Sequence, residues 1–325
     1  MTMQTDTISF DELTAKQKAV MPNLFIIGAA KCGTTSLHAY LSAHPDITGS
    51  SQKEPSFFVD QKELERELLM ESTRPESYDL DAYLALFDHG PTAKYRMEAS
   101  PTYSSHPTYT GVAQRIAAAS PDAHIIYMIR NPVERSISKY WQDRKTLRQT
   151  RPANEVLLEA DNVYTHSSDY KMQLDIYKGL FKNIHVILAE DLRKEPQKVL
   201  NDIYHRLGLP KHVYNPEDLR ERNTTPATTR VARHALVTRL RDTQTWNKVR
   251  ARAPKPLLQL ARKLTVKDLP RTIENEPEVR QVLIQRFAPK MAAFDAAYGT
   301  DLHDQWFAGV MQAAPEKNLD EPPAS

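Results

Sequence analysis

One stretch near the N-terminus constrains the fold more than any other, because an apolar run, a glycine-bounded loop and a helical pattern follow directly on one another there. Residues 24–27 predict a buried strand that ends at Gly28, and a helical pattern begins at about Thr35. This order points backbone N–H groups and the positive end of a helix toward one place, an arrangement that suits a phosphate group.

The glycines of this loop allow a more specific comparison. Gly28 and Gly33 have the spacing of a Walker A loop, which requires Lys and then Ser or Thr directly after the second glycine. Here Thr34 and Thr35 follow, and the loop lysine is Lys31, two residues before Gly33. The loop therefore predicts a phosphate site without the usual NTPase lysine. A P-loop-like nucleotide kinase or NTPase stays an alternative, disfavoured by the position of that lysine.

Short apolar runs alternate with helical patterns along the chain. Strands are predicted at 24–27, 95–98, 124–129 and 185–189, and helices at 35–43, 80–87, 111–120, 132–148, 170–181, 197–207 and 276–307. The alternation predicts an α/β fold, a single P-loop-like domain with a central parallel sheet flanked by helices and a helical C-terminal segment. Phosphate sites then fall at the carboxyl ends of strands.

Three segments occur in the order typical of one enzyme family. Residues 31–37, followed by His44-Pro45, resemble the 5′-phosphosulfate loop of sulfotransferases that use 3′-phosphoadenosine 5′-phosphosulfate (PAPS). Residues 125–140 resemble that family's 3′-phosphate element, and residues 53–58 resemble the Glu-x-x-Phe-Phe segment of its heparan-sulfate-type branch. With a downstream match, the chain resembles PAPS-dependent sulfotransferases over residues 22–210, closest to the heparan-sulfate-type and bacterial carbohydrate branch.

The resemblance implies a donor site with two anionic ends. Arg130 and Ser138 would hold the 3′-phosphate, since a guanidinium and a hydroxyl suit a phosphate monoester. Lys31 would follow the charge that develops on the bridging oxygen as the sulfur–oxygen bond breaks. The loop residues that would hold the 5′ end are Lys31, Cys32, Gly33, Thr34, Thr35 and Ser36. PAPS would be the co-substrate and 3′-phosphoadenosine 5′-phosphate (PAP) the product, with no metal required.

The acceptor must lose a proton as it attacks, so the site needs a base within hydrogen-bond reach. The resemblance implies Glu54 as that base, with Lys53 tuning it. His44 and His106 are rival bases. The implied reaction moves a sulfuryl group to a hydroxyl or amine of a carbohydrate or another small or lipid-linked metabolite by in-line displacement.

Two further segments of the motifs leave alternatives open. Residues 98–103 resemble a Glu-Lys-Ser/Thr-Pro-x-Tyr element in which Ala99 stands in place of the lysine, so another cation would have to serve. Glu98 is either in contact with the substrate or part of a turn at a strand end. Arg135 fits the 3′-phosphate element either as a ligand or as a structural residue. Cys32 is interpreted as a small apolar residue of the loop and not as a nucleophile.

Composition bounds the class of protein. The chain has 325 residues and a formal net charge of +2, which does not favour nucleic-acid binding. A single cysteine excludes an intrachain disulfide and suggests a reducing compartment. The first 20 residues are polar and carry no apolar signal segment, so the expected location is cytoplasmic. The oligomeric state is left open.

The expected organisation is an arm over 1–21, one catalytic domain over 22–312 and a disordered tail over 313–325. Residues 230–271 stand out within that domain, because they contain twelve lysines or arginines and only two aspartates. This segment predicts one or two amphipathic helices broken near Pro254 and Pro256. They form either a basic cover that contacts an anionic or membrane-associated acceptor, or a solvated helical pair whose lysine and arginine stems cover a small core. A peripheral protein that binds lipid or a polyanion is the second alternative function.

Overall fold

The computed structural model describes residues 10–68, 74–90, 92–146, 148–215, 217–219, 228–232 and 266–311. Its centre is a sheet of five strands: β1 (Leu24–Gly28), β2 (Ile47–Gly49), β3 (Tyr95–Ala99), β4 (His124–Ile129) and β5 (Asn183–Leu188). The strand order is β2-β3-β1-β4-β5, and every neighbouring pair is parallel. The predicted α/β class is confirmed.

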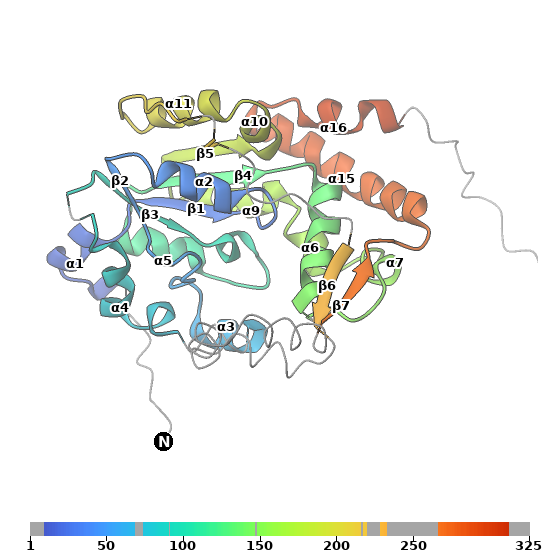
Figure 1. Ribbon diagram of the computed structural model, residues 1–325, viewed down its shortest axis with the longest axis horizontal. Helices are drawn as coiled ribbons and strands as arrows, with labels where there is room; N and C mark the ends of the chain where they lie inside the picture. Colours follow the sequence, from blue (N-terminus) through green and yellow to red (C-terminus); the bar gives the residue numbers. More distant parts are fainter. Residues whose placement is uncertain are drawn as a thin grey trace, which may run out of the picture.

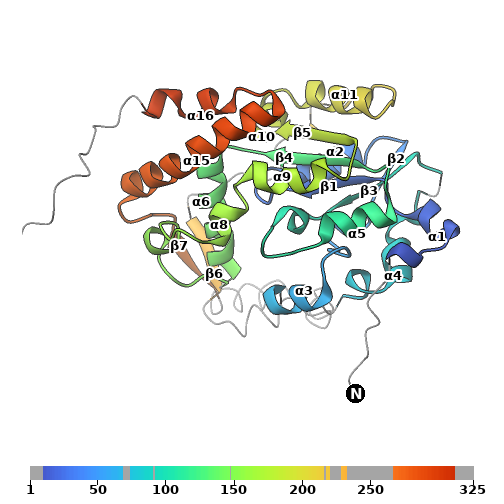
Figure 2. The same ribbon diagram turned by 180° about the vertical axis from the view of Figure 1, so that it is seen from behind.

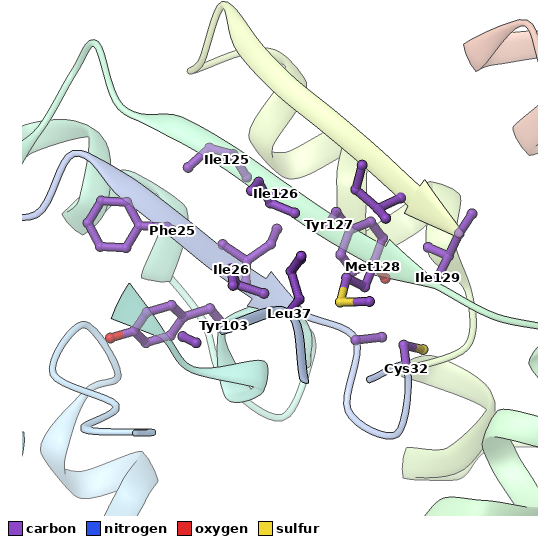
Figure 3. Packing of buried hydrophobic residues seen from close by; sticks show 14 of the residues in the cluster. Phe25, Ile26, Cys32, Leu37, Tyr103, Ile125, Ile126, Tyr127, Met128 and Ile129 are labelled. Carbon is purple, nitrogen blue, oxygen red and sulfur yellow. The ribbon is translucent and has the colours of Figure 1, made fainter. Parts of the chain in front are cut away.

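The four predicted strands are present, and the two central ones, β1 and β4, are apolar runs that are almost fully buried, as parallel strands covered on both faces require. All five residues of β1 are buried. Figure 3 shows Phe25 and Ile26 of β1 beside Ile125 and Ile126 of β4, with Leu37 from the following helix against them. The edge strand β2 was not predicted, since three residues are too few to form a recognisable apolar run.

Helices cover both faces of this sheet. Figure 1 shows α2 (Thr34–Leu41) in front of the strands, and Figure 2, from behind, shows α5 (Val112–Ala119) and α9 (Tyr170–Lys178) in front of them. Beyond the β5 edge lie α10 (Ala189–Lys194), α11 (Pro196–Arg206), α15 (Glu276–Tyr298) and α16 (Leu302–Met311). The long helix α6 (Pro132–Thr146) leaves the carboxyl end of β4 and packs against α15.

The remaining elements are short. They are η1 (Phe10–Glu12), α1 (Ala15–Val20), α3 (Gln61–Leu68), η3 (Pro75–Ser77), α4 (Leu80–Leu84), η4 (Ala85–Phe87), η5 (Pro101–Ser104), α7 (Ala153–Val156), α8 (Val163–His166), β6 (Thr228–Ala232) and β7 (Val266–Pro270). Phe10 of η1 is buried, and its ring stacks on that of Phe58 at a centroid distance of 5.1 Å.

Two sequence predictions are wrong at the C-terminal side. The single helix predicted over 276–307 is two helices, because Gly299 ends α15 with a φ of 67° and the Asp295 carboxylate accepts the backbone N–H groups of Leu302 and His303 that begin α16. The ends of the basic segment are not helical either. Strands β6 and β7 pair antiparallel, with Arg230 opposite Asp268. Residues 233–265, the rest of that segment, lie outside the described residues, as does the tail predicted over 313–325.

Candidate functional site

The loop between β1 and α2 has a backbone that few residue types adopt. Lys31 has a φ of 74° and Gly33 a φ of 91°, both in the left-handed region, which non-glycine residues enter rarely. Gly28 leaves no room for a side chain, because a Cβ there would lie 1.9 Å from the Ser104 hydroxyl oxygen. The loop therefore folds back sharply and directs its backbone toward the N-terminus of α2.

Buried Arg135 supports this loop from below. Its guanidinium donates to the Ala30 carbonyl oxygen at 3.4 Å, to the Ser168 hydroxyl at 2.6 Å and to the Tyr164 carbonyl oxygen at 2.8 Å. The side chain is 0% exposed, so no ligand can reach it without rearrangement. Of the two roles open for Arg135, the structure therefore favours the structural one.

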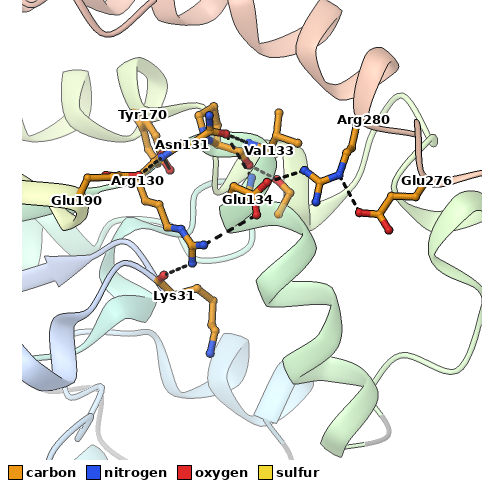
Figure 4. Close-up of polar contacts among 11 residues, drawn as sticks. Lys31, Arg130, Asn131, Val133, Glu134, Tyr170, Glu190, Glu276 and Arg280 are labelled. Atoms are coloured by element: carbon orange, nitrogen blue, oxygen red, sulfur yellow. Dashed lines mark hydrogen bonds and ion pairs between the residues drawn. The ribbon is translucent and has the colours of Figure 1, made fainter. Parts of the chain in front are cut away.

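Arg130 lies at the carboxyl end of β4 and reaches across to the loop (Figure 4). Its Nη1 donates to the Lys31 carbonyl oxygen at 3.4 Å, and its Nη2 lies 4.0 Å from the Glu134 carboxylate. The backbone carbonyl of Arg130 accepts from the Tyr170 hydroxyl at 2.6 Å. The two elements predicted to hold opposite ends of the donor thus meet directly.

The turn after Arg130 begins α6. The Asn131 side chain accepts the backbone N–H groups of Val133 and Glu134 at 3.0 and 3.3 Å, and the Asn131 N–H donates to Glu190 at 3.1 Å. Asn131 is therefore the N-cap that the sequence analysis did not single out, although an Asn-Pro pair before a helix is a known signal. Ser138 lies farther along α6 and is half-buried.

Positive charge gathers at the Lys31 side chain. The pKa of Lys31 is lowered mainly by burial. Repulsion by nearby cations lowers it further; these are Arg271, Lys139, Lys145 and Arg130. Among the described residues, the Lys31 ammonium has no hydrogen-bond or ion-pair partner. A partly buried ammonium surrounded by other cations is an environment that an anionic ligand stabilises.

The segment that carries Glu54 lies against the same loop. Lys53 Nζ donates to Glu54 Oε1 at 2.6 Å and to the Thr34 hydroxyl at 3.4 Å. The Glu54 backbone N–H donates to the Ala99 carbonyl oxygen at 3.1 Å, at the end of β3. Glu54 has a φ of 62° and keeps 46% of its side chain exposed. The candidate base therefore faces solvent beside the loop, where an acceptor can reach it.

Glu98 lies beneath that segment and is fully buried. Its carboxylate accepts hydrogen bonds from the Tyr83 hydroxyl and from the Ser100 hydroxyl, the latter at 2.6 Å, and Ser100 accepts the Ser56 backbone N–H at 3.1 Å. Burial raises the pKa of Glu98 to about 6 although these hydrogen bonds oppose the shift. Of the alternatives left open for Glu98, the geometry favours the structural one, because the carboxylate supports the Glu54 segment from within the core.

The other candidate bases, His44 and His106, lie in surroundings that differ from those of Glu54. Both ring nitrogens of His44 are occupied, since Nε2 donates to the Pro210 carbonyl oxygen at 3.0 Å and Nδ1 accepts the Asp46 N–H at 3.1 Å. The His106 backbone N–H donates to Gln173 at 2.9 Å, and the residue is half-buried. Burial raises the pKa of the Cys32 thiol to about 12, which disfavours a thiolate nucleophile.

The remaining predicted loop residues differ in exposure. Thr34 is buried with its hydroxyl toward Lys53, whereas Thr35 is exposed and Ser36 half-buried at the start of α2. No three His, Cys, Asp or Glu side chains in the described part of the chain gather into a group that could hold a metal ion. Within that same part, no helix combines the length and apolar character needed to cross a bilayer.

The sequence is similar to a family model and to proteins of known activity. A sequence model described as "Sulfotransferase family" matches residues 22–213. The bifunctional heparan sulfate N-deacetylase/N-sulfotransferase 1 of Caenorhabditis briggsae is 24% identical over 218 residues, which cover 61% of this chain and 24% of that protein. Heparan sulfate glucosamine 3-O-sulfotransferase 6 of Homo sapiens is 33% identical over 121 residues, covering 37% of this chain and 30% of that protein.

One solved structure resembles nearly the whole fold. The sulfotransferase from Alicyclobacillus acidocaldarius superposes with a TM-score of 0.61 at 28% sequence identity, covering 88% of this chain and 98% of that one. The curated relatives are longer proteins, and the matched part of this chain spans less than a third of either.

Proposed function

Because the chain belongs to the sulfotransferase family (EC 2.8.2.-), whose co-substrate is PAPS, we propose that it transfers the sulfuryl group of PAPS to a hydroxyl or amine of a carbohydrate or another small or lipid-linked metabolite. The proposal rests on a series of contacts that connects Arg130, the loop and Glu54. Arg130 donates to the Lys31 backbone, and Lys53 joins Thr34 of the same loop to Glu54. Candidate groups for both phosphates and for the acceptor proton thus lie together at the carboxyl ends of the strands β1, β3 and β4.

The residues present fit PAPS on two grounds. The Lys31 ammonium lacks a partner among the described residues and lies among other cations, so an anion would relieve their repulsion. The loop also turns its backbone toward the N-terminus of α2, where N–H groups bind phosphate oxygens. We assign the 5′ end to residues 31–36 and the 3′-phosphate to Arg130 and Ser138.

The proposed chemistry is an in-line displacement at sulfur. The bond between sulfur and the acceptor atom forms while the bond between sulfur and the bridging phosphate oxygen breaks, and the electron pair of the broken bond stays on that oxygen. Lys31 stabilises the charge that appears there. Glu54 takes the acceptor proton. Exposure of the Glu54 side chain leaves room for an acceptor beside it.

The curated relatives support a carbohydrate acceptor, because their names refer to heparan sulfate. One of those names refers to N-sulfation and the other to O-sulfation, so either atom type is part of the proposal. The cytoplasmic location and the domain boundaries expected from the sequence stay predictions.

The test combines binding with transfer. PAP should raise the melting temperature, because a ligand at a hundred times its Kd stabilises a fold by about 2.7 kcal/mol, while ATP with Mg²⁺ should not raise it. Radiolabelled PAPS should then label at least one acceptor in a panel of glycans with free hydroxyls or amines, lipids and small metabolites. Stabilisation by ATP alone, together with no labelled product, would support the kinase alternative and refute this proposal.

A further inference from the structure

Lys53 links the donor loop and the candidate base. Its ammonium lies 2.6 Å from Glu54 Oε1 and 3.4 Å from the Thr34 hydroxyl oxygen, and 19% of its side chain is exposed. Thr34 begins α2, directly after the left-handed Gly33. One lysine therefore contacts both the loop and the candidate base.

The backbone brings these groups together by an unusual route. Neighbouring side chains on an extended backbone point to opposite sides, so Lys53 and Glu54 would ordinarily diverge. The positive φ of Glu54, 62°, breaks this alternation, and the Lys53 ammonium contacts both the Glu54 carboxylate and Thr34 of the loop. Left-handed backbone at a non-glycine residue costs free energy and persists where the surrounding structure holds it, often at functional sites.

Stability alone gives little reason for this contact. An ion pair between neighbouring, partly exposed side chains adds little to the stability of a fold, because solvent screens it. The Lys53 charge nevertheless reaches farther into the fold, because together with burial it lowers the pKa of His38 on α2 to about 4. Its ammonium therefore acts on His38 in the last turn of α2 as well as on Glu54.

We propose that Lys53 is a second catalytic cation, which rests on the function proposed above. Before the donor binds, Lys53 pairs with Glu54. Once the donor is bound, its ammonium turns to the non-bridging oxygens of the sulfuryl group beside the Thr34 hydroxyl, and this frees Glu54 to take the acceptor proton. Lys53 keeps its own protons throughout. The two lysines divide the work, since Lys31 acts on the leaving oxygen and Lys53 on the transferred group.

This assignment predicts different effects of a Lys53 variant on PAP binding and on sulfuryl transfer from PAPS. PAP lacks the sulfuryl group, so removing the Lys53 charge should leave PAP affinity within about threefold of the wild type while it slows transfer. The loss of one group that stabilises transition-state charge slows turnover by roughly 10²–10³-fold. Lys53→Met keeps most of the side-chain stem and removes the charge, and Lys53→Arg restores a cation. Lys62→Met, at an exposed position on α3, is the matched control.

The experiment measures the PAP Kd, the PAPS Kd, the kcat for radiolabelled transfer and the melting temperature for all four proteins. We expect a slow Lys53→Met variant with wild-type PAP affinity, partial recovery of kcat in Lys53→Arg and an unchanged control. A Lys53→Met variant with kcat within threefold of the wild type, or with PAP affinity lost as strongly as kcat, overturns the role of Lys53. A wild-type protein that transfers no sulfuryl group to any acceptor refutes the proposed function itself, and Lys53 with it.

Discussion

The protein holds the cations at the two ends of the proposed donor site in different ways. Arg130 is fixed by the Lys31 carbonyl, by the Glu134 carboxylate and, through its own backbone, by Tyr170. The Lys31 ammonium has no partner in the described residues, although its backbone is held in the left-handed region. One side chain is fixed in place, and the other is free on a fixed backbone.

This difference corresponds to a difference in task. A preorganised guanidinium loses little conformational entropy when it binds a phosphate, so Arg130 suits binding. The charge on a leaving oxygen appears only as its bond to sulfur breaks, and a free ammonium can follow it. The comparison therefore predicts that changes on the 5′ side, with its neighbour Glu54, reduce rate, whereas changes on the 3′ side reduce affinity.

Glu54→Gln should give the largest effect. The change is nearly isosteric and removes the proton acceptor, so transfer should fall by about 10²–10⁴-fold while PAP affinity and melting temperature stay at wild-type values. Radiolabelled transfer and PAP titration measure both, and Glu65→Gln on the exposed side of α3 is the control. A rate near that of the wild type would take the base role from Glu54 and direct attention to His106.

Lys31→Ala should reduce kcat by about 10²–10³-fold and PAP affinity by less than tenfold, because the ammonium acts on charge that is absent from the ground state. Steady-state kinetics and PAP calorimetry on the same preparation separate the two numbers. Equal losses in kcat and in affinity would make Lys31 a binding residue and end the contrast with Arg130.

Arg130→Ala should instead weaken binding selectively. A charge-assisted hydrogen bond is worth about 1.5–3 kcal/mol, so PAP affinity should fall by roughly ten- to a hundredfold. Adenosine 5′-phosphate lacks the 3′-phosphate and is the internal control, with an expected change below threefold. If both nucleotides lose affinity equally, Arg130 supports the loop and does not bind the 3′-phosphate.

The smallest effect concerns acid stability on the 5′ side. His38 has a folded pKa of about 4, below its unfolded value near 6.5, because of burial first and the Lys53 charge second. Its contribution to stability is therefore complete above pH 6.5 and is lost as the pH falls toward 4. His38→Gln should flatten unfolding free energy against pH in that window, and Lys53→Met should raise the His38 pKa followed by NMR. An unchanged His38 titration in Lys53→Met would contradict the assigned position of the ammonium.

The sequence predicted most of the sheet and the identity of the phosphate loop, because both depend on local patterns. Continuous apolar runs mark β1 and β4, and glycine spacing marks the loop. The partners of the site residues could not be predicted in the same way. That Arg135 lies buried under the loop and that His44 Nε2 donates to Pro210 follow from contacts with residues far away in the sequence.

The errors have physical causes as well. The basic segment has helical spacing of its apolar residues, yet its ends pair as strands, since partners across a sheet outweigh intrinsic propensity. The break in the last helix had a visible signal in Gly299. The contact between Lys53 and Thr34 had none, because it depends on the left-handed backbone of Glu54.

The long helix α15 lies outside the stretch that matches the family, yet it reaches the 3′ side of the site. Arg280 of α15 pairs with Glu134 at 2.5 Å and with Glu276 at 2.8 Å, so it competes with Arg130 for the same carboxylate (Figure 4). In a shortened protein that ends at the family boundary, Glu134 would be left to Arg130 alone and would oppose the incoming phosphate. The smallest unit worth expressing for nucleotide binding therefore extends through α15, well beyond residue 213.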